Sequence, residues 1–456
     1  MVKIRFIILI SFLFFSNYGF SAQKVKIIRD SEIEFFLHKV ISSVLEHKEN
    51  KNYYPRLVLN NQYNAFVIGS NKIYVNTGLI KKSKSLSEVQ AILAHEIGHL
   101  ALNHYSSRLI NAKSLNNYSK LATLAGLALS ADGKLDPNST IGLIIGSNDL
   151  AKKSLLKFSR IQEQQADKFA LDKLVKRKIS LKGLEILLSN LEKEELTDSN
   201  STLSYYRSHP FSKNRLKQLQ RYKLQYQNIP INEQKILIYN NVISLKYIKN
   251  KINAYNVDPY KIIKSSENND DFLSKYSQII ALYRVGKYDT AFKNLETIQN
   301  EYKNYPFFFE LKGDIYFKKG EFDKAKIEYE KTIKTLKEVF SPSTDLIKFS
   351  LVKTYLQTKK ITDLKKSVII LEELLLNNPN WSYLWRLLAK SSGKLDNMGV
   401  SYIALAEEAL IKKNFIKAKK YVDLANKQVS LPSIYKLRGE DILARIRVIK
   451  SKNIRQ

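Results

Sequence analysis

The most informative stretch of the sequence is His95-Glu96-Ile97-Gly98-His99, in which two histidines are four residues apart and a glutamate follows the first. On an α-helix, residues four apart lie on one face, so both imidazoles can reach a single metal ion. Zinc is the usual occupant, here with one ion per chain. Glu96 sits about 100° round the helix from His95, where its carboxylate can take a proton from a water held at the metal. The motif therefore predicts a zinc-dependent hydrolase with Glu96 as a catalytic residue.

The motif lies in a stretch, residues 85–104, that has the pattern of a buried helix. Ser85 followed three residues later by Glu88 is a capping box, which marks a helix start. Apolar residues then repeat at helical spacing, at Val89, Ile92, Leu93, Ile97 and Leu100. A chance match to the motif is disfavoured because the whole chain has only six histidines. The motif is thus expected about two turns inside a helix, as a metal site requires.

A catalytic zinc needs a third protein ligand and one open position. His104 follows His99 by five residues, and on a continuing helix it would point almost opposite His95, so it is not expected at the metal. The best candidate is Glu163, in a helical pattern that begins at residue 160. Asp167 shares its face and can hold a ligand histidine through the second ring nitrogen. Taken alone, this acidic pair would indicate a solvated helix face.

His209 and Arg215 form a further candidate pair, before and within a basic helical pattern. In a zinc hydrolase, such donors near the metal can hold the oxyanion of the tetrahedral intermediate, which makes His209 a second candidate catalytic residue. The alternative is that His209-Pro210 is only a loop before a helix. Two other histidines, His38 and His47, are expected to be surface or packed residues and not ligands.

The elements upstream of the motif must position it. Residues 31–45 have the pattern of an amphipathic helix, and residues 56–59, 64–68 and 72–75 predict short strands. The last strand leads into the motif helix, and it is either the edge along which an extended substrate pairs or an ordinary sheet strand. Downstream, residues 121–131 and 141–146 are small and apolar but too short to cross a bilayer. They are either buried helices or a mobile flap over the cleft.

The first 22 residues have the pattern of an export signal, with Lys3 and Arg5 before an apolar run and small residues up to Ala22. This predicts a periplasmic protein, with an uncleaved membrane anchor as the minority interpretation. The chain has no cysteine, which excludes disulfides, a cysteine nucleophile and thiolate zinc ligands. The formal charge is +32, but lysine is spread over the whole length, so no nucleic acid is expected as a partner. Peripheral contact with anionic membrane surfaces is left open.

The C-terminal half is nearly all amphipathic helix and contains an internal repeat. Gly286-Lys-Tyr-Asp-Thr-Ala291 and Gly320-Glu-Phe-Asp-Lys-Ala325 recur at a period of 34, which is the tetratricopeptide length. Stacked repeats of this kind build a concave groove that binds peptides or protein partners. A purely structural solenoid is the alternative.

The combined motifs resemble those of the zinc metalloprotease family that includes the CAAX prenyl protease and the HtpX peptidase. The match covers roughly residues 30–225 and rests on Asn64-Ala65-Phe66, Thr77-Gly78-Leu79, the His95–His99 motif, Glu163 with Asp167, and Ser208-His209-Pro210 with Arg215. Within the family, the architecture is similar to the soluble periplasmic BepA-like branch. The resemblance implies His95, His99 and Glu163 as zinc ligands, Glu96 as general base and acid, and Asp167 as a supporting residue. Arg215 is also expected to support the site. It also suggests that His209 gates the metal at rest and that the apolar segment plugs the cleft.

The predicted fold is mainly α: an α+β zincin-like (gluzincin) peptidase domain with a small β-sheet, followed by an all-α tetratricopeptide solenoid. The expected boundaries are a signal peptide at 1–22, the peptidase at 23–226, a connecting helix and linker at 227–270, repeats at 271–449 and a basic tail at 450–456. By resemblance, the protein is a periplasmic zinc endopeptidase that degrades misfolded or misassembled envelope and outer-membrane proteins. Its repeats would recruit substrate or the outer-membrane assembly machinery. The alternative is a chaperone or assembly scaffold with a latent or structural metal site.

Overall fold

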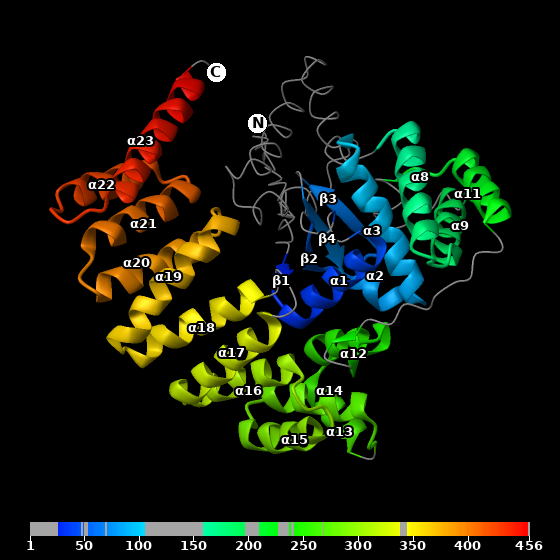
Figure 1. The fold of residues 1–456 in the computed structure, drawn as a ribbon, viewed down its shortest axis with the longest axis horizontal. Helices are drawn as coiled ribbons and strands as arrows, with labels where there is room; N and C mark the ends of the chain where they lie inside the picture. Colours follow the sequence, from blue (N-terminus) through cyan, green and yellow to red (C-terminus); the bar gives the residue numbers. More distant parts are fainter. Residues whose placement is uncertain are drawn as a thin grey trace, which may run out of the picture.

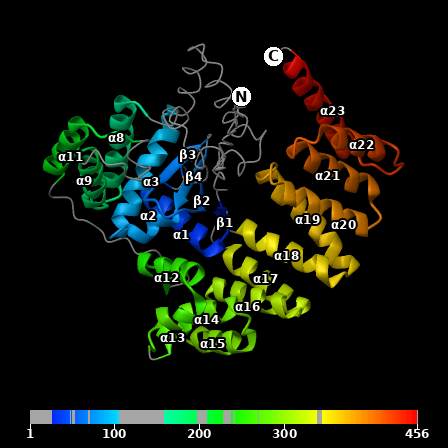
Figure 2. The ribbon, with the colours of Figure 1, turned by 180° about the vertical axis from the view of Figure 1, so that it is seen from behind.

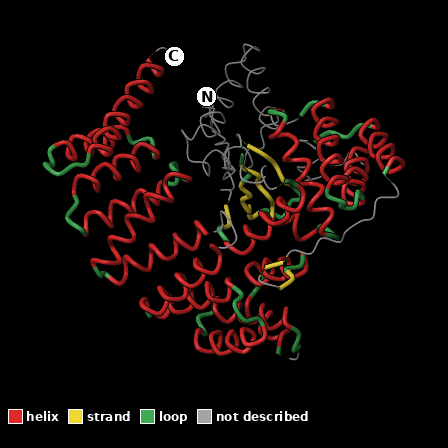
Figure 3. The backbone as a smooth tube through the Cα atoms, in the orientation of Figure 1, coloured by secondary structure: helices red, strands yellow, loops and turns green. Residues whose placement is uncertain are grey.

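The chain is mainly helical, as predicted, with a small sheet in the N-terminal part and an arc of helices in the C-terminal part (Figures 1 and 3). The computed structural model describes residues 26–46, 49, 53–68, 71–104, 158–196, 209–226, 237–238, 241–267, 269–337 and 344–454. The expected export signal, His47 and the two apolar runs lie outside the described residues. Among the helices that are described, none is long and apolar enough to cross a membrane.

Four strands form the sheet, in the order β1-β2-β4-β3. They are β1 (Lys26–Ile28), β2 (Tyr54–Leu59), β3 (Ala65–Ile68) and β4 (Lys72–Asn76). β3 folds back antiparallel on one side of β4, while β2 runs parallel to β4 on the other side. The strand that leads toward the motif helix is therefore an interior strand, which corrects the interpretation of residues 72–75 as a sheet edge. The edge beside it is β3.

Two helices pack against each other beside this sheet, α1 (Ser31–Val44) and α3 (Leu86–Ala101), and the short α2 (Thr77–Lys82) precedes α3. α3 begins as predicted, because the Ser85 hydroxyl accepts a hydrogen bond from the backbone N–H of Glu88. The reciprocal half of the box differs, since the Glu88 carboxylate accepts from the backbone N–H of Lys84 at 2.8 Å. Both bonds satisfy N–H groups that a helix start otherwise leaves without a partner.

Three further helices lie along α3 on the side away from the repeats (Figures 1 and 2). They are α8 (Arg160–Lys176), α9 (Lys182–Leu196) and α11 (Lys213–Gln225). α8 and α9 pack directly on α3, and α11 packs on both of them. The helix that carries the His95–His99 motif is consequently enclosed between the sheet, α1 and this second helical layer.

The segment expected to be a connecting helix and linker, residues 227–270, is more structured than predicted. It contains a small hairpin, β5 (Leu237–Ile238) and β6 (Asn241–Val242), and then α12 (Leu245–Asn256) and α13 (Pro259–Ser266). α12 packs on α2 of the N-terminal part and on α14 of the repeats. The segment therefore bridges the two parts by direct contact.

The C-terminal part is an array of antiparallel helix pairs that curves away from the sheet (Figure 1). Its helices are α14 (Phe272–Arg284), α15 (Tyr288–Glu301), α16 (Pro306–Lys319), α17 (Phe322–Lys337), α18 (Thr344–Thr358), α19 (Ile361–Asn377), α20 (Ser382–Lys394), α21 (Met398–Ile411), α22 (Phe415–Asn426) and α23 (Ser433–Ile454). Gly286 and Gly320, which open the two sequence repeats, have φ of 81° and 79°, a left-handed conformation that favours glycine. α23 continues into the segment predicted as a basic tail.

A buried glutamate at the start of α1 joins the two parts of the chain. The carboxylate of Glu32 accepts hydrogen bonds from three tyrosine hydroxyls and pairs with a lysine; we call these residues the tyrosine clasp: Glu32, Tyr247, Tyr276, Tyr305 and Lys251. Burial lowers the pKa of Lys251, but the negative charges of Asp30 and Glu32 outweigh it and hold this pKa well above its ordinary value. Apolar residues of both parts continue around the clasp as one hydrophobic core. The repeats are thus packed onto the N-terminal part and not merely tethered to it.

The substitution Tyr276→Phe is expected to lower the free energy of unfolding by about 1.5–3 kcal/mol, because it removes one donor from a buried carboxylate and keeps the ring packing. The Tyr276 hydroxyl lies 2.8 Å from Glu32 Oε2. The midpoint of urea unfolding measures the change. Tyr260→Phe is the matched control, since Tyr260 is 67% exposed. Equal midpoints for the two variants would show that the clasp does not stabilise the chain.

Candidate metal centre

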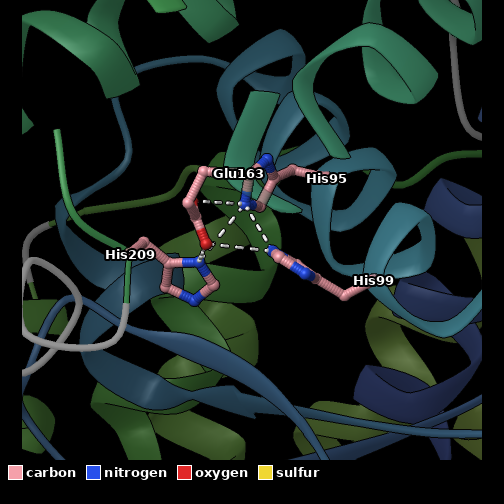
Figure 4. A group of neighbouring side chains, drawn as sticks. All are labelled: His95, His99, Glu163 and His209. Carbon is pink, nitrogen blue, oxygen red and sulfur yellow. Dashed lines mark hydrogen bonds and ion pairs between the residues drawn. The ribbon is translucent and has the colours of Figure 1, made fainter. Parts of the chain in front are cut away.

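Two histidines from α3 and two residues from other elements converge on one buried point (Figure 4). Their candidate ligand atoms all lie within 4.8 Å of one another, and we call the four residues the metal cluster: His95, His99, Glu163 and His209. All four are fully buried. His95 and His99 lie one turn apart on α3, Glu163 is in the first turn of α8, and His209 precedes α11.

The close spacings among these atoms match the distances between ligand atoms around a tetrahedral zinc ion. His95 Nε2 lies 3.1 Å from His99 Nε2 and 3.2 Å from His209 Nδ1. The Glu163 oxygens lie 3.4 Å from His95 Nε2, 3.3 Å from His99 Nε2 and 3.2 Å from His209 Nδ1. Tetrahedral zinc with bonds of about 2.0–2.1 Å places its ligand atoms about 3.3 Å apart. Buried imidazole nitrogens that face one another at this distance also need a proton or a cation between them.

The charge state of the two α3 histidines suits a site that holds a cation. Burial lowers the pKa of His95, but the carboxylates of Asp167 and Glu163 outweigh this effect and raise the pKa to about 9. His95 Nδ1 lies 2.9 Å from Asp167 Oδ1, which directs Nε2 toward the cluster. Burial lowers the pKa of His99 well below its ordinary value, which keeps this imidazole neutral. A divalent ion would replace the His95 proton as the positive charge, so metal binding releases a proton.

Arg215 is a buried counter-ion for two carboxylates of α8, those of Glu163 and Asp167. Its Nε and Nη2 lie 2.6 and 2.9 Å from the two oxygens of Asp167, and its Nη1 lies 2.9 Å from Glu163 Oε2. Burial raises the pKa of each carboxyl, but His209 and then Arg215 hold the pKa of Glu163 well below its usual value, and Arg215 with His95 holds the pKa of Asp167 below its own. These contacts favour a supporting role for Arg215 over the alternative of an oxyanion donor.

Glu96 lies beside the metal cluster and is fully buried. Its Oε1 is 3.3 Å from Nε2 of His209, whose other ring nitrogen faces the cluster. A single imidazole therefore contacts both the ligand set and the predicted base. In total, the structure brings together all the site residues expected from sequence: His95, Glu96, His99, Glu163, Asp167, His209 and Arg215.

The glycine inside the motif allows α8 to approach α3 closely. A Cβ added at Gly98 would lie 3.1 Å from both the Cα and the backbone oxygen of Ala166, a tight contact for any side chain. Ala166 lies between Glu163 and Asp167 on α8, so this close crossing brings both carboxylates to the histidines. A capping box at Ser159 fixes the first turn of α8, where Glu163 lies.

Sequence reasoning misplaced His104. α3 ends at Ala101, and Asn103 adopts a φ of 54°, so the chain turns back instead of continuing as a helix. His104 stays outside the metal cluster, as predicted, but it does not point away from it: its Nδ1 lies 3.0 Å from His99 Nδ1. Asn103 is the signal that could have revealed the turn, because asparagine tolerates the left-handed conformation that often ends a helix. His38 is packed on α1, 3% exposed and outside the cluster.

Two family models match this chain. Residues 28–223 match a model described as peptidase family M48. Residues 278–353 match a model described as a tetratricopeptide repeat-like domain. The first range contains every residue of the metal cluster, and the second runs from within α14 to within α18.

Curated relatives include proteins that match over most of the chain and proteins that match over a shorter range. The beta-barrel assembly-enhancing protease of Escherichia coli (strain K12) is 19% identical over 397 residues, which cover 87% of this chain and 79% of the relative. Metalloprotease YcaL of the same strain is 30% identical over 162 residues, 35% of this chain and 58% of the relative. Mitochondrial metalloendopeptidase OMA1 of Schizosaccharomyces pombe is 26% identical over 157 residues, 34% of this chain and 42% of the relative.

Proposed function

Residues 28–223 of this chain belong to peptidase family M48, and we propose that the protein is a zinc-dependent endopeptidase of the bacterial periplasm that degrades misassembled envelope proteins. The observation that carries this proposal is the metal cluster, whose donor atoms are spaced for tetrahedral zinc and lie beside a buried glutamate. The chemistry of the donors also agrees, since imidazoles and a carboxylate, with no thiolate, are typical of a catalytic and not a structural zinc site.

When zinc is bound, it acidifies a water molecule and polarises the carbonyl of the scissile peptide bond. His95, His99 and Glu163 would hold the ion. Glu96 accepts the proton of the attacking water and returns it to the leaving amine, which is general base and then general acid catalysis. Asp167 keeps His95 in the tautomer that leaves Nε2 bare, and Arg215 neutralises the carboxylates that crowd this small volume.

His209 is proposed to gate the site at rest. Its Nδ1 takes the fourth position of the cluster, and its Nε2 contacts Glu96. In this arrangement one imidazole stands where a substrate or water must bind and also engages the base. His209 lies in the loop before α11, so a shift of that loop could release both groups together. After such a shift, the histidine is placed to donate a hydrogen bond to the developing oxyanion.

Unfolded or misassembled outer-membrane proteins are the proposed substrates. The support is the match over most of the chain to relatives named beta-barrel assembly-enhancing protease, together with the helical array, which is a form that commonly binds protein segments. We propose that the array recruits either these substrates or the machinery that assembles them. The pattern of the first 22 residues supports export to the periplasm.

An unfolded outer-membrane β-barrel protein, incubated with the purified full-length chain, is expected to be cleaved in the presence of zinc. Chelator should abolish cleavage and added zinc should restore it, because the proposed mechanism needs the ion. Gel electrophoresis of the products measures the reaction, and the same barrel folded in detergent is the control that should resist. Retention of the unfolded barrel on the chain without any cleavage would instead favour the chaperone or scaffold hypothesis.

A further inference from the structure

A buried histidine outside the metal cluster stands behind it and contacts one of its ligands. His104 is 4% exposed, and its Nδ1 lies 3.0 Å from Nδ1 of His99. Its other nitrogen, Nε2, lies 3.0 Å from Oε1 of Gln165. His99 in turn directs its own Nε2 to the cluster, 3.1 Å from His95 Nε2. The three side chains thus form a line, with the exposed Gln165 at its outer end and the buried His99 at the proposed metal.

The positions of the protons on His104 and His99 follow from the chemistry of Gln165. An amide oxygen only accepts hydrogen bonds, so the nitrogen of His104 that faces Gln165 must carry a proton. In a neutral imidazole the other nitrogen is then an acceptor, and it faces His99. His99 must therefore donate from Nδ1, which leaves its Nε2 with a bare lone pair directed at the cluster. This is the tautomer that a zinc ligand needs.

From this geometry we infer that His104 is a positioning residue, which fixes the tautomer and the ring orientation of the ligand His99 and is itself fixed by Gln165. The inference rests on the proposed metal binding at this site. A second contact supports the orientation: the ring of Phe158 stacks on His99 with centroids 3.6 Å apart and planes 19° apart. His99 is consequently held at its edge by His104 and at its face by Phe158.

The two ligand histidines of α3 are oriented by different chemistry. His95 donates to a carboxylate, Asp167, which carries its own buried counter-ion. His99 meets an imidazole, that of His104. A second carboxylate in the place of His104 would add one more negative charge to a buried volume that already holds three, and each uncompensated charge there is costly. A neutral acceptor orients the ligand without that cost.

One short segment of α8 organises both systems. Glu163 is a proposed ligand, Gln165 ends the line through His104, and Asp167 supports His95. Gln162, one turn earlier than Ala166, also donates to the backbone oxygen of His104 at 3.5 Å. The packing of α8 on α3 therefore positions the proposed ligand Glu163 together with the residues that support the two ligand histidines.

The test is the zinc affinity of the full-length chain, measured by competition with a chromophoric chelator of known affinity. His104→Leu is expected to raise the dissociation constant about 10–100-fold, the usual effect of removing a group that orients a metal ligand. His104→Gln should recover most of the wild-type affinity, because its amide offers an oxygen to His99 and an N–H to Gln165. His38→Leu is the matched control, since His38 is also buried, at 3% exposure, but lies outside the cluster.

The outcomes separate this inference from the proposed metal site itself. Wild-type protein that binds no zinc would contradict the metal site, whereas tight wild-type binding that His104→Leu leaves unchanged would overturn only the role of His104. Loss of affinity in His104→Gln as large as in His104→Leu would also overturn it, because that pattern indicates general packing damage. If His104→Leu does not fold, Gln165→Leu replaces it. That variant removes only the far acceptor, and it should weaken zinc binding if the inference holds and leave it unchanged if it does not.

Discussion

The substitution Glu96→Gln is expected to lower kcat for peptide hydrolysis by about 10²–10⁴-fold while zinc remains bound, because it removes the proton acceptor and keeps the side chain's shape. Glu96 is fully buried beside the metal cluster, and its Oε1 is 3.3 Å from His209 Nε2. It does not belong to the set of candidate ligands. The loss should therefore appear in the chemical step and not in metal content.

Glu88→Gln is the matched control for this experiment. Glu88 is on the same helix and is 2% exposed, but it accepts hydrogen bonds at the start of the helix, from Tyr63 and from the backbone of Lys84. Its loss should reduce stability and leave kcat of the folded fraction near the wild-type value. Turnover of a fluorogenic peptide and the zinc content by atomic absorption measure the two effects. A Glu96→Gln enzyme with wild-type kcat would remove Glu96 from the mechanism.

The substitution Arg215→Met is expected to lower the free energy of unfolding by about 3–5 kcal/mol in chelator, since it leaves two buried carboxylates without their counter-ion. Arg215 is fully buried and contacts Glu163 and both oxygens of Asp167. Methionine retains much of the apolar stem, so the missing charge should dominate the effect. The midpoint of urea unfolding measures it.

Zinc should partly rescue this variant. The ion would bind the same carboxylate, Glu163, that Arg215 neutralises, so it can supply positive charge where the arginine is missing. The deficit relative to wild type is therefore expected to be larger in chelator than in excess zinc. Arg221→Met, at an exposed position of the same helix, is the control and should change neither midpoint. Equal midpoints for the two variants in chelator would show that the carboxylates do not depend on Arg215.

The sequence was sufficient for the features that depend on local spacing. The helix start at Ser85, the pair of histidines four residues apart and the pair Glu163 and Asp167 all follow from helical periodicity and capping. The helical repeat followed from its period of 34, which the two loop glycines support. In each of these cases, a local rule and the final fold agree.

Features that depend on contacts between distant parts of the chain could not be predicted from local spacing. Chain order left the strand next to the motif helix as either an edge or an ordinary sheet strand. It is interior because β4 inserts between β2 and β3, which only the assembled sheet decides. His104 was misplaced because the helix was assumed to continue past Ala101. Glu32 is an acid in the first turn of α1, and nothing in its local sequence marks it out. Its three tyrosine partners come from positions more than 200 residues further along the chain.

The tyrosine clasp has a consequence for how a bound client would be cut. A recognition domain on a flexible linker samples many distances from an active site, so it raises the local concentration of client without selecting a position. Here the core continues from the peptidase part into the repeats, and the clasp fastens their junction. The first repeats, which share that core, therefore keep one position relative to the metal cluster. For a client held on the array, the cleavage site would therefore be selected by its distance along the client chain from the segment that is held.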